Sequence, residues 1–405
     1  MFKFLFSKRD EGINCKRKIF GISITTKPNR LKLKQLDEKI EKLKKENAIL
    51  NNLISSCSYQ NLTKDYISNL DSTKPFVSVI ITVYNLGRRY LVQCLESVIN
   101  QSLKNIEIIL VNDCSPLEED DKVCSEYANK DKRIKYIKHD SNMGDGKSRM
   151  TGLKNASGYS VSFIDGDDFL SLNLYEIAFY EMVKNNVEIV CYNYNIVNIT
   201  ENNISINNSY MKYIPYSVFY GDNIINLYAS IDNPLDMGLW SKLYKKELLD
   251  KLGYDNILDR KRAKDVSYNF KIFSNAKSFL YIPLNLYFYV VSKSDSITNS
   301  RLKKDTYFTD VRDSILDANK YIDDNKLYDN KVYLNNLFSH FLLDFYEHAI
   351  YLNRIDKNKD YLLLIKNIVV ELLNEKAIDK NVLLNCLSVL TDKKDFISWY
   401  RKIIL

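Results

Sequence analysis

Short apolar runs alternate with amphipathic stretches between about residue 75 and residue 300. A run without a charge, Val77 to Val83, predicts the first strand, and apolar residues that recur every three or four positions predict helices between the strands. Further strands are expected at 106–111, 134–137 and 159–164. This alternation is typical of an α/β fold. Ligands in such folds bind beyond the carboxyl ends of the strands, so the residues that follow each predicted strand are the first candidates for a site.

Two other patterns flank this part of the chain. Apolar residues repeat as a heptad from Leu33 to Ile54, and from about residue 301 the aromatic-rich stripes predict helices only. The sequence therefore divides into four segments, which are a basic amphipathic tail at 1–30, a coiled-coil helix at 31–58, an α/β domain at 75–300 and a helical domain at 301–405.

The heptad segment predicts a parallel homodimer. Leu occupies its d positions, and β-branched residues with one Asn, Asn47, occupy most of its a positions, which is the composition of two-stranded coiled coils. An amphipathic helix that lies on its own domain is the alternative, because three heptads are marginal alone.

The formal net charge of +7 is concentrated at the amino end, where residues 1–35 hold ten Lys or Arg and only two acidic residues, Asp10 and Glu11. Phenylalanines stand among these charges, so we expect a peripheral contact with an acidic membrane and no nucleic-acid partner. A solvated, poorly ordered terminus is the alternative.

The compartment is expected to be the cytoplasm, with at most a peripheral position on the inner face of the membrane. No apolar run reaches the roughly 18 residues that span a bilayer. Met1 to Phe6 lacks the long apolar core and cleavage site of a signal peptide. The seven cysteines include no C-x-x-C pair, and their odd number argues against a disulfide framework.

An acidic cluster, Asp165-Gly166-Asp167-Asp168, follows the fourth predicted strand. Carboxylates this close repel one another unless a cation or hydrogen bonds offset their charge. Hard oxygen ligands suit Mg²⁺ or Mn²⁺, which keep waters and share phosphate oxygens with a substrate. Gly166 would allow a tight turn that directs the flanking carboxylates toward one point. The alternative is a surface turn, because Asp-Gly pairs often form one.

Seven segments stand in a fixed order along the chain: Val79 to Asn85, Glu107 to Ser115, Asn142 to Gly144 with Arg149 and Gly152, Asp165 to Asp168, Trp240 to Leu248, Lys264 to Phe270, and Ser296 to Thr298. As an ordered series they resemble glycosyltransferase family 2, of the bacterial surface-polysaccharide type. The resemblance covers about residues 75 to 300. It implies a GT-A fold, a Rossmann-like mixed sheet with helices on both faces.

The resemblance implies an inverting, metal-dependent transfer of a sugar from a nucleotide diphosphate, expected to be UDP, to a hydroxyl of a glycan or lipid-linked acceptor. Tyr84 and Asn85 would bind at the base, where Tyr84 would stack. Asp113 would accept a hydrogen bond from uracil. Asp167, helped by Asp165, would hold Mn²⁺ or Mg²⁺.

The remaining roles implied by the resemblance concern the transfer itself. Arg149 would add positive charge near the diphosphate, Trp240 would line the acceptor side, and Asp265 would be the general base. Asp265 is also expected near the amino end of a helix, because apolar residues at 266, 270 and 273 follow it with helical spacing. An N-terminal helix cap is the alternative role for Asp265.

The sequence departs from the family pattern at several positions. Thr82 stands where Pro is usual, Asn112 and Cys114 replace an Asp and a Gly beside Asp113, Met150 replaces an Asn, and Lys264 replaces a Glu. The change at Asn112 leaves base recognition to Asp113.

Two other functions are left as alternatives. A sugar-phosphate nucleotidyltransferase can share such a sheet and an acidic metal pair, but it needs a Gly-rich basic loop after the first strand, and Asn85 to Arg89 is poor in Gly. A non-catalytic coiled-coil scaffold with a degenerate transferase body would not be expected to retain Asp113, Asp165, Asp167 and Asp265 together.

Overall fold

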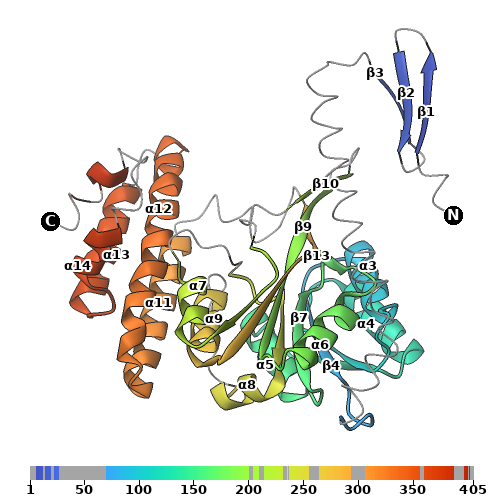
Figure 1. Ribbon diagram of the computed structural model, residues 1–405, viewed down its shortest axis with the longest axis horizontal. Helices are drawn as coiled ribbons and strands as arrows, with labels where there is room; N and C mark the ends of the chain where they lie inside the picture. The colour runs from blue at the N-terminus through green and yellow to red at the C-terminus, as the bar shows by residue number, and fades with distance from the viewer. Residues whose placement is uncertain are drawn as a thin grey trace. The chain divides into compact units, whose positions relative to one another are not determined.

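The structure is a computed structural model of the 405-residue chain. It describes residues 6–11, 14–19, 22–26, 70–199, 204–208, 214–230, 235, 237–254, 264–292, 306–355, 360–386, 396–399 and 401. The chain divides into two compact units, Met1–Leu70 and Asp71–Leu405 (Figure 1).

The first unit contains an antiparallel three-stranded sheet of β1 (Phe6–Glu11), β2 (Asn14–Ile19) and β3 (Ile22–Thr26), paired in that order. The sequence pattern indicates a basic tail in this segment and does not predict the strands. Lys and Arg are so frequent in β1 and β2 that no alternation of apolar and polar residues marks them. The predicted coiled coil at 31–58 lies outside the described residues.

The second unit is built on a mixed sheet, 10-stranded within the described residues, in the order β11-β13-β9-β12-β7-β4-β5-β6, with β10 on β9 and β8 on β13. Its strands are β4 (Val77–Val83), β5 (Ile106–Asn112), β6 (Ile134–Lys138), β7 (Ser160–Asp165), β8 (Phe169–Leu170), β9 (Ile189–Ile199), β10 (Ile204–Asn208), β11 (Ser217–Tyr220), β12 (Lys242–Lys245) and β13 (Ser278–Ser292). The strands β7, β4, β5 and β6 are parallel neighbours, so their carboxyl ends meet at one edge.

The four strands predicted from apolar runs are confirmed as β4, β5, β6 and β7, with β4 at its predicted bounds and the others within one residue. Six of the seven residues of β4 are buried, because helices cover both faces of the sheet around it. Central parallel strands of this kind are nearly continuous apolar runs, which is why the sequence locates them well.

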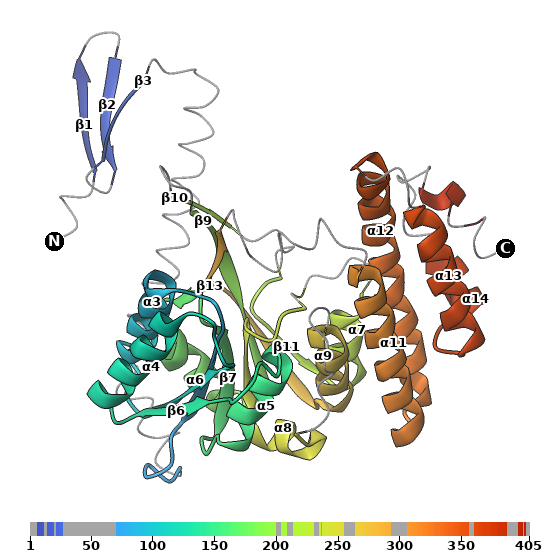
Figure 2. The same cartoon turned by 180° about the vertical axis from the view of Figure 1, so that it is seen from behind.

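Helices lie on both sides of the sheet (Figure 2). On one side are α3 (Arg88–Ile99), α4 (Glu118–Lys130) and α6 (Leu174–Lys184), and the core on the other side includes residues of α5 (Asp145–Lys154), α7 (Asp222–Tyr228), α8 (Lys246–Leu252) and α9 (Lys264–Asn275). Together with the mixed sheet, they confirm the predicted α/β class. No helix among the described residues combines the length and the apolar character that crossing a membrane requires.

The region after residue 301 is helical where it is described, as predicted. It contains α11 (Thr306–Asn325), a short 3-10 helix η2 (Tyr328–Asn330), α12 (Lys331–Ile355), α13 (Tyr361–Asn374) and α14 (Lys380–Cys386). The apolar stripe predicted on α12 is buried. One hydrophobic cluster runs from α5, α7 and α9 into these helices, so the helical region shares its core with the α/β region.

Polar contacts also join α9 to α11. The Lys271 Nζ of α9 lies 2.7 Å from the Asp317 Oδ2 of α11, and the Ser267 hydroxyl donates to the same carboxylate. Lys271 and Ser267 are buried. Because a buried ammonium is costly without a partner, this carboxylate helps to fix α9 against the helical region.

Candidate functional site

The acidic turn Asp165–Asp168 forms at the carboxyl end of β7, as predicted. The Asp168 amide donates to the Asp165 carbonyl at 3.0 Å and closes the turn. A Cβ on Gly166 would stand 2.7 Å from the Thr82 carbonyl and 2.5 Å from the Leu86 side chain. Glycine is therefore needed here because the Thr82 carbonyl and the Leu86 side chain leave no room for a Cβ. The reason is not a left-handed backbone, since Gly166 does not have a positive φ.

Asp168 is a structural member of the turn. Its buried carboxylate accepts from the Tyr287 hydroxyl at 2.6 Å and from the Val290 amide at 2.7 Å, so it ties the turn to β13. Burial, followed by the negative charges of Asp167 and Asp165, raises the pKa of Asp168 above its ordinary value.

Asp167 is a second carboxylate of the turn whose ionised form is disfavoured by its surroundings. Burial, followed by the charges of Asp165 and Asp145, raises its pKa to about 7. Within the described part of the chain, no three His, Cys, Asp or Glu side chains are grouped as a complete metal-ligand set. Two carboxylates nevertheless fit Mg²⁺ or Mn²⁺, since these ions complete their coordination with water and substrate phosphate.

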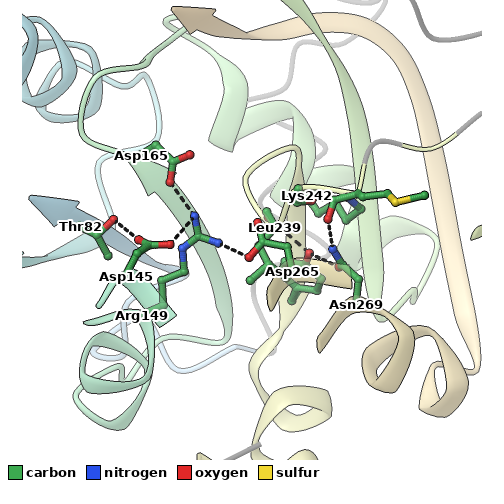
Figure 3. A network of polar contacts seen from close by, with 11 residues as sticks. Thr82, Asp145, Arg149, Asp165, Leu239, Lys242, Asp265 and Asn269 are labelled. Carbon is green, nitrogen blue, oxygen red and sulfur yellow. Dashed lines mark hydrogen bonds and ion pairs between the residues drawn. The ribbon is translucent and has the colours of Figure 1, made fainter. Parts of the chain in front are cut away.

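Arg149, on α5, lies between the acidic turn and α9 (Figure 3). Its Nη2 is 2.6 Å from the Asp165 Oδ1 and 3.2 Å from the Asp145 Oδ2, while its Nη1 donates to the Asp265 Oδ1 at 2.9 Å. Burial disfavours the charged guanidinium, but the charges of Asp145, Asp265 and Asp165 outweigh it and raise the pKa of Arg149. Arg149 is thus buried and paired with three carboxylates. Its predicted contact with the diphosphate stays a prediction.

Asp145 is a member of this network that the sequence motifs did not indicate. It precedes Arg149 by one helical turn, and its Oδ1 accepts from the Thr82 hydroxyl at 2.7 Å (Figure 3). Thr82, on strand β4, is the residue that replaces the usual Pro. Its hydroxyl donates the hydrogen bond that links Asp145 to this strand. The i,i+4 spacing of Asp145 and Arg149 was a signal that could have revealed the pair.

Asp265 lies in the first turn of α9, as predicted, with a side chain that is 22% exposed. The helix begins at Lys264, so Asp265 is inside the helix rather than at the preceding cap position. The structure brings Asp265 within hydrogen-bond distance of the same guanidinium as Asp165, although it is 116 positions from Arg149 in the sequence.

Tyr84 and Asn85 follow β4 at the predicted edge of the sheet. The Tyr84 side chain is 47% exposed, which leaves its ring accessible. Asn85 has a left-handed backbone, with a φ of 55°, and its amide donates to the Ser115 hydroxyl at 3.0 Å. The bend at Asn85 therefore depends on the loop that follows the neighbouring strand β5.

Asp113 is close to this loop, since its amide donates to the Val83 carbonyl at 3.0 Å. Its buried carboxylate is within 2.8 Å of the His139 Nδ1, the Met143 amide and the Gly144 amide. Asp113 thus fixes the loop after β6. Its predicted contact with the base stays a prediction. A carboxylate has about four acceptor directions, and these contacts use three of them.

Trp240 precedes β12 and is only 7% exposed. Its ring stacks on Tyr287, with centroids 4.6 Å apart, and on Tyr289 at 5.4 Å, and it meets the edge of Tyr194 at 4.6 Å. Trp240 is therefore the centre of an aromatic cluster, and its predicted contact with an acceptor stays a prediction.

Comparison with known proteins supports the expected family for part of the chain. Residues 78–253 match the family described as Glycosyl transferase family 2. The chain contains a family 2 glycosyltransferase domain. The matched part of this domain includes the acidic turn, Arg149 and Trp240, whereas Asp265 follows it. The geometry of Asp265 is thus an observation independent of the family match.

Two curated relatives match parts of the family 2 domain. Glycosyltransferase GlyA of Streptococcus pneumoniae serotype 4 is 32% identical over 220 residues, which are 54% of this chain and 31% of GlyA. The minor teichoic acid biosynthesis protein GgaB of Bacillus subtilis is 41% identical over 118 residues, which are 28% of this chain and 13% of GgaB. The chain therefore spans well under half the length of either relative.

Solved structures resemble a larger part of the chain. Two crystal structures of S. aureus TarS 1-349, one of them in complex with UDP-GlcNAc, align with TM-scores of 0.57 and 0.56. Both are 17% identical and cover 81% of this chain and 90% of the TarS chain. This likeness is one of fold, and it agrees with the GT-A type predicted for the family 2 domain.

Proposed function

We propose that the protein is an inverting glycosyltransferase that moves a sugar from a UDP-linked donor to a hydroxyl of a glycan or lipid-linked acceptor in surface-polysaccharide synthesis. The observation that carries the proposal is the guanidinium of Arg149, which contacts both Asp165 of the acidic turn and Asp265 of α9. A donor-side carboxylate and a candidate base are thereby held on one buried side chain, as direct displacement between two bound substrates requires.

Similar proteins and the geometry of the site both support the proposed donor and pathway. A TarS structure is described with UDP-GlcNAc, and GgaB is named for minor teichoic acid biosynthesis. In this chain, the exposed ring of Tyr84 beside Asn85 suits stacking on a base, and the remaining acceptor direction of Asp113 suits the imide N–H of uracil.

Asp167 and Asp165 are the residues that would hold Mn²⁺ or Mg²⁺. Burial, followed by the charges of Asp165 and Asp145, raises the pKa of Asp167, and a divalent cation bound beside it would favour its ionised form. When bound, the cation would supply a Lewis acid for the diphosphate leaving group. Asp145 adds negative charge at the same place and so favours a cation there.

Asp265 would take the proton from the acceptor hydroxyl. Arg149 contacts its Oδ1, which leaves Oδ2 as the oxygen that would receive the proton. In the transfer, the hydroxyl oxygen forms a bond to the anomeric carbon while the bond from that carbon to the diphosphate oxygen breaks. The leaving UDP keeps that electron pair, and attack from the opposite face inverts the configuration.

Arg149 would serve the reaction by fixing distances. Its guanidinium is a rigid planar fork, so contacts of 2.6 Å to Asp165 and 2.9 Å to Asp265 set the separation between the donor side and the base. Because Arg149 is buried, it would not touch the donor directly but would act on it through these carboxylates.

Further proposals concern the acceptor and the setting of the enzyme. The aromatic cluster around Trp240 would support the acceptor side, where aromatic rings suit the apolar faces of sugars. A homodimer through residues 33–54, a cytoplasmic location and peripheral contact with acidic membrane complete the proposal, and they rest on the sequence pattern alone.

Incubation of the full-length protein with a panel of UDP-sugars and Mn²⁺, followed by measurement of released UDP with and without candidate acceptors, tests the function. We expect UDP release from one donor, a lower rate in EDTA, and stimulation by acceptor. Pyrophosphate formed from UTP and a sugar phosphate would instead identify a nucleotidyltransferase. Absence of turnover with every donor and acceptor would favour the scaffold.

A further inference from the structure

Two adjacent loops bend sharply at the ends of β4 and β5. Asn85 has a φ of 55° and Cys114 a φ of 54°, which is the left-handed region that residues with a side chain seldom adopt. Tyr84 directly precedes the first bend, and Asp113 directly precedes the second. Because such bends are unfavourable by themselves, contacts from elsewhere must hold both loops in place.

One carboxylate supplies such contacts to both loops. Asp120, in the first turn of α4, accepts from the Leu86 amide at 3.0 Å, the Gly87 amide at 2.8 Å and the Ser115 hydroxyl at 2.7 Å. It is 0% exposed. The loop after β4 and the loop after β5 therefore share one buried acceptor group.

Ser115 also connects the two loops by hydrogen bonds. While its hydroxyl donates to Asp120, the same oxygen accepts from the Asn85 amide at 3.0 Å and from the Leu117 amide at 3.2 Å. The Ser115 amide donates to the Asn112 Oδ1 at 2.8 Å. The backbone at the first bend is thus bonded to a side chain beyond the second bend.

The charge on Asp120 makes these contacts interdependent. Among the described residues, its carboxylate accepts from two backbone amides and a hydroxyl, whereas the nearby cation Arg88 pairs with Glu119 and Glu126. A buried carboxylate without a cation depends on its hydrogen bonds, because each bond that is lost leaves desolvated charge without compensation. Movement of either loop alone would break contacts that the other loop shares.

We propose that Asp120 is a positioning residue that holds the Tyr84 loop and the Asp113 loop together as one nucleotide-binding surface. This inference rests on the proposed function, since it concerns the donor side of that site. Asp120 touches neither substrate, and it acts through the two loops that would contact the base.

The test compares three full-length variants with the wild type. Asp120→Asn keeps the shape but replaces one accepting oxygen by a donor, so at least one loop contact is lost. Ser115→Ala removes the hydroxyl that bonds to Asp120 and to the Asn85 amide, and it alters no charge. Glu119→Gln is the matched control, because Glu119 lies in the same helical turn but has a half-exposed side chain that pairs with Arg88. The readouts are the Kd for UDP by calorimetry, donor KM, kcat and Tm.

We expect Asp120→Asn to raise the Kd for UDP and the donor KM by about tenfold, the scale of one unsatisfied buried group. Ser115→Ala should raise both in the same direction, Glu119→Gln should match the wild type, and kcat at saturating donor should change by less than about twofold because the transfer groups are untouched. A merely structural role would lower Tm without changing the Kd of the folded protein.

Wild-type Kd and donor KM in folded Asp120→Asn would overturn the inference. If that variant does not fold, Ser115→Ala decides, and wild-type affinity in Ser115→Ala would overturn it equally. Failure of the wild type to bind UDP would instead contradict the proposed function, which distinguishes the two failures.

Discussion

The loops after β4, β5 and β6 form what we call the nucleotide side, and the residues Asp145, Arg149, Asp165, Asp167 and Asp265 form the transfer side. On the nucleotide side, the buried carboxylates of Asp113 and Asp120 are held mainly by neutral donors, among them backbone amides. On the transfer side, three carboxylates share the single guanidinium of Arg149. The first arrangement fixes the geometry of loops, whereas the second gathers several carboxylates around one cation.

This difference indicates how each side would work. Neutral donors can hold a loop in one conformation before any ligand arrives, which reduces the cost of ordering it on binding. A cluster of carboxylates instead favours an incoming cation, and burial together with the charges of Asp165 and Asp145 raises the pKa of Asp167 in agreement with this. Variants should therefore affect binding on the nucleotide side and turnover on the transfer side.

The largest expected effect follows Asp265→Asn, which removes the proposed base from the transfer side. Transfer should fall by about 10³-fold, within the range that proton transfer contributes, while the Kd for UDP should stay near the wild-type value. Steady-state transfer assays and calorimetry check this. Asp222→Asn is the control, because Asp222 is an exposed acidic residue in the first turn of α7. Near-normal transfer by Asp265→Asn would refute the assignment.

A somewhat smaller effect is expected for Asp167→Asn, which keeps the shape but removes a charge from the proposed cation site. Turnover should fall by about 10²-fold, the scale of electrostatic transition-state stabilisation, and folding should survive. EDTA should lower wild-type turnover, and added Mn²⁺ should restore it. Equal activity in EDTA and in Mn²⁺ would contradict the role of Asp167.

Asp317→Asn tests whether the transfer side depends on the helical region. This change removes the carboxylate that pairs with buried Lys271 on α9, so we expect a loss of about 3 kcal/mol in the free energy of unfolding. Transfer should fall by about threefold as α9 loses its anchor. Thermal unfolding and transfer assays check both. Asp324→Asn, an exposed change on α11, should alter neither.

The smallest effect on chemistry is expected from deletion of residues 1–58. If both sides of the site belong to Asp71–Leu405, donor hydrolysis by the truncated protein should stay within about twofold of wild type. Light scattering should show a dimer converted to a monomer, because the predicted coiled coil is removed. A dimer in both proteins would place the interface elsewhere, and loss of hydrolysis would show that the amino-terminal unit contributes to the site.

The sequence alone determined the parts of the site that are formed locally. Val77 to Val83 is recognisable as a strand because both of its faces are buried and nearly all its side chains are apolar. The acidic turn was predictable because Asp165, Gly166, Asp167 and Asp168 are consecutive. The start of α9 near Asp265 followed from apolar residues with helical spacing, which depend only on near neighbours.

Only the tertiary structure decided which side chains meet. Arg149 contacts Asp265 from 116 positions away, and Asp120 holds amides 33 and 34 positions before it. In the sequence, Asp120 is one of four acidic residues in a row and is indistinguishable from an ordinary solvated helix start. Periodicity reports which face of an element is buried, but a hydrogen-bond partner is set by the crossing of strands and helices that are distant in the chain, so no local pattern records it.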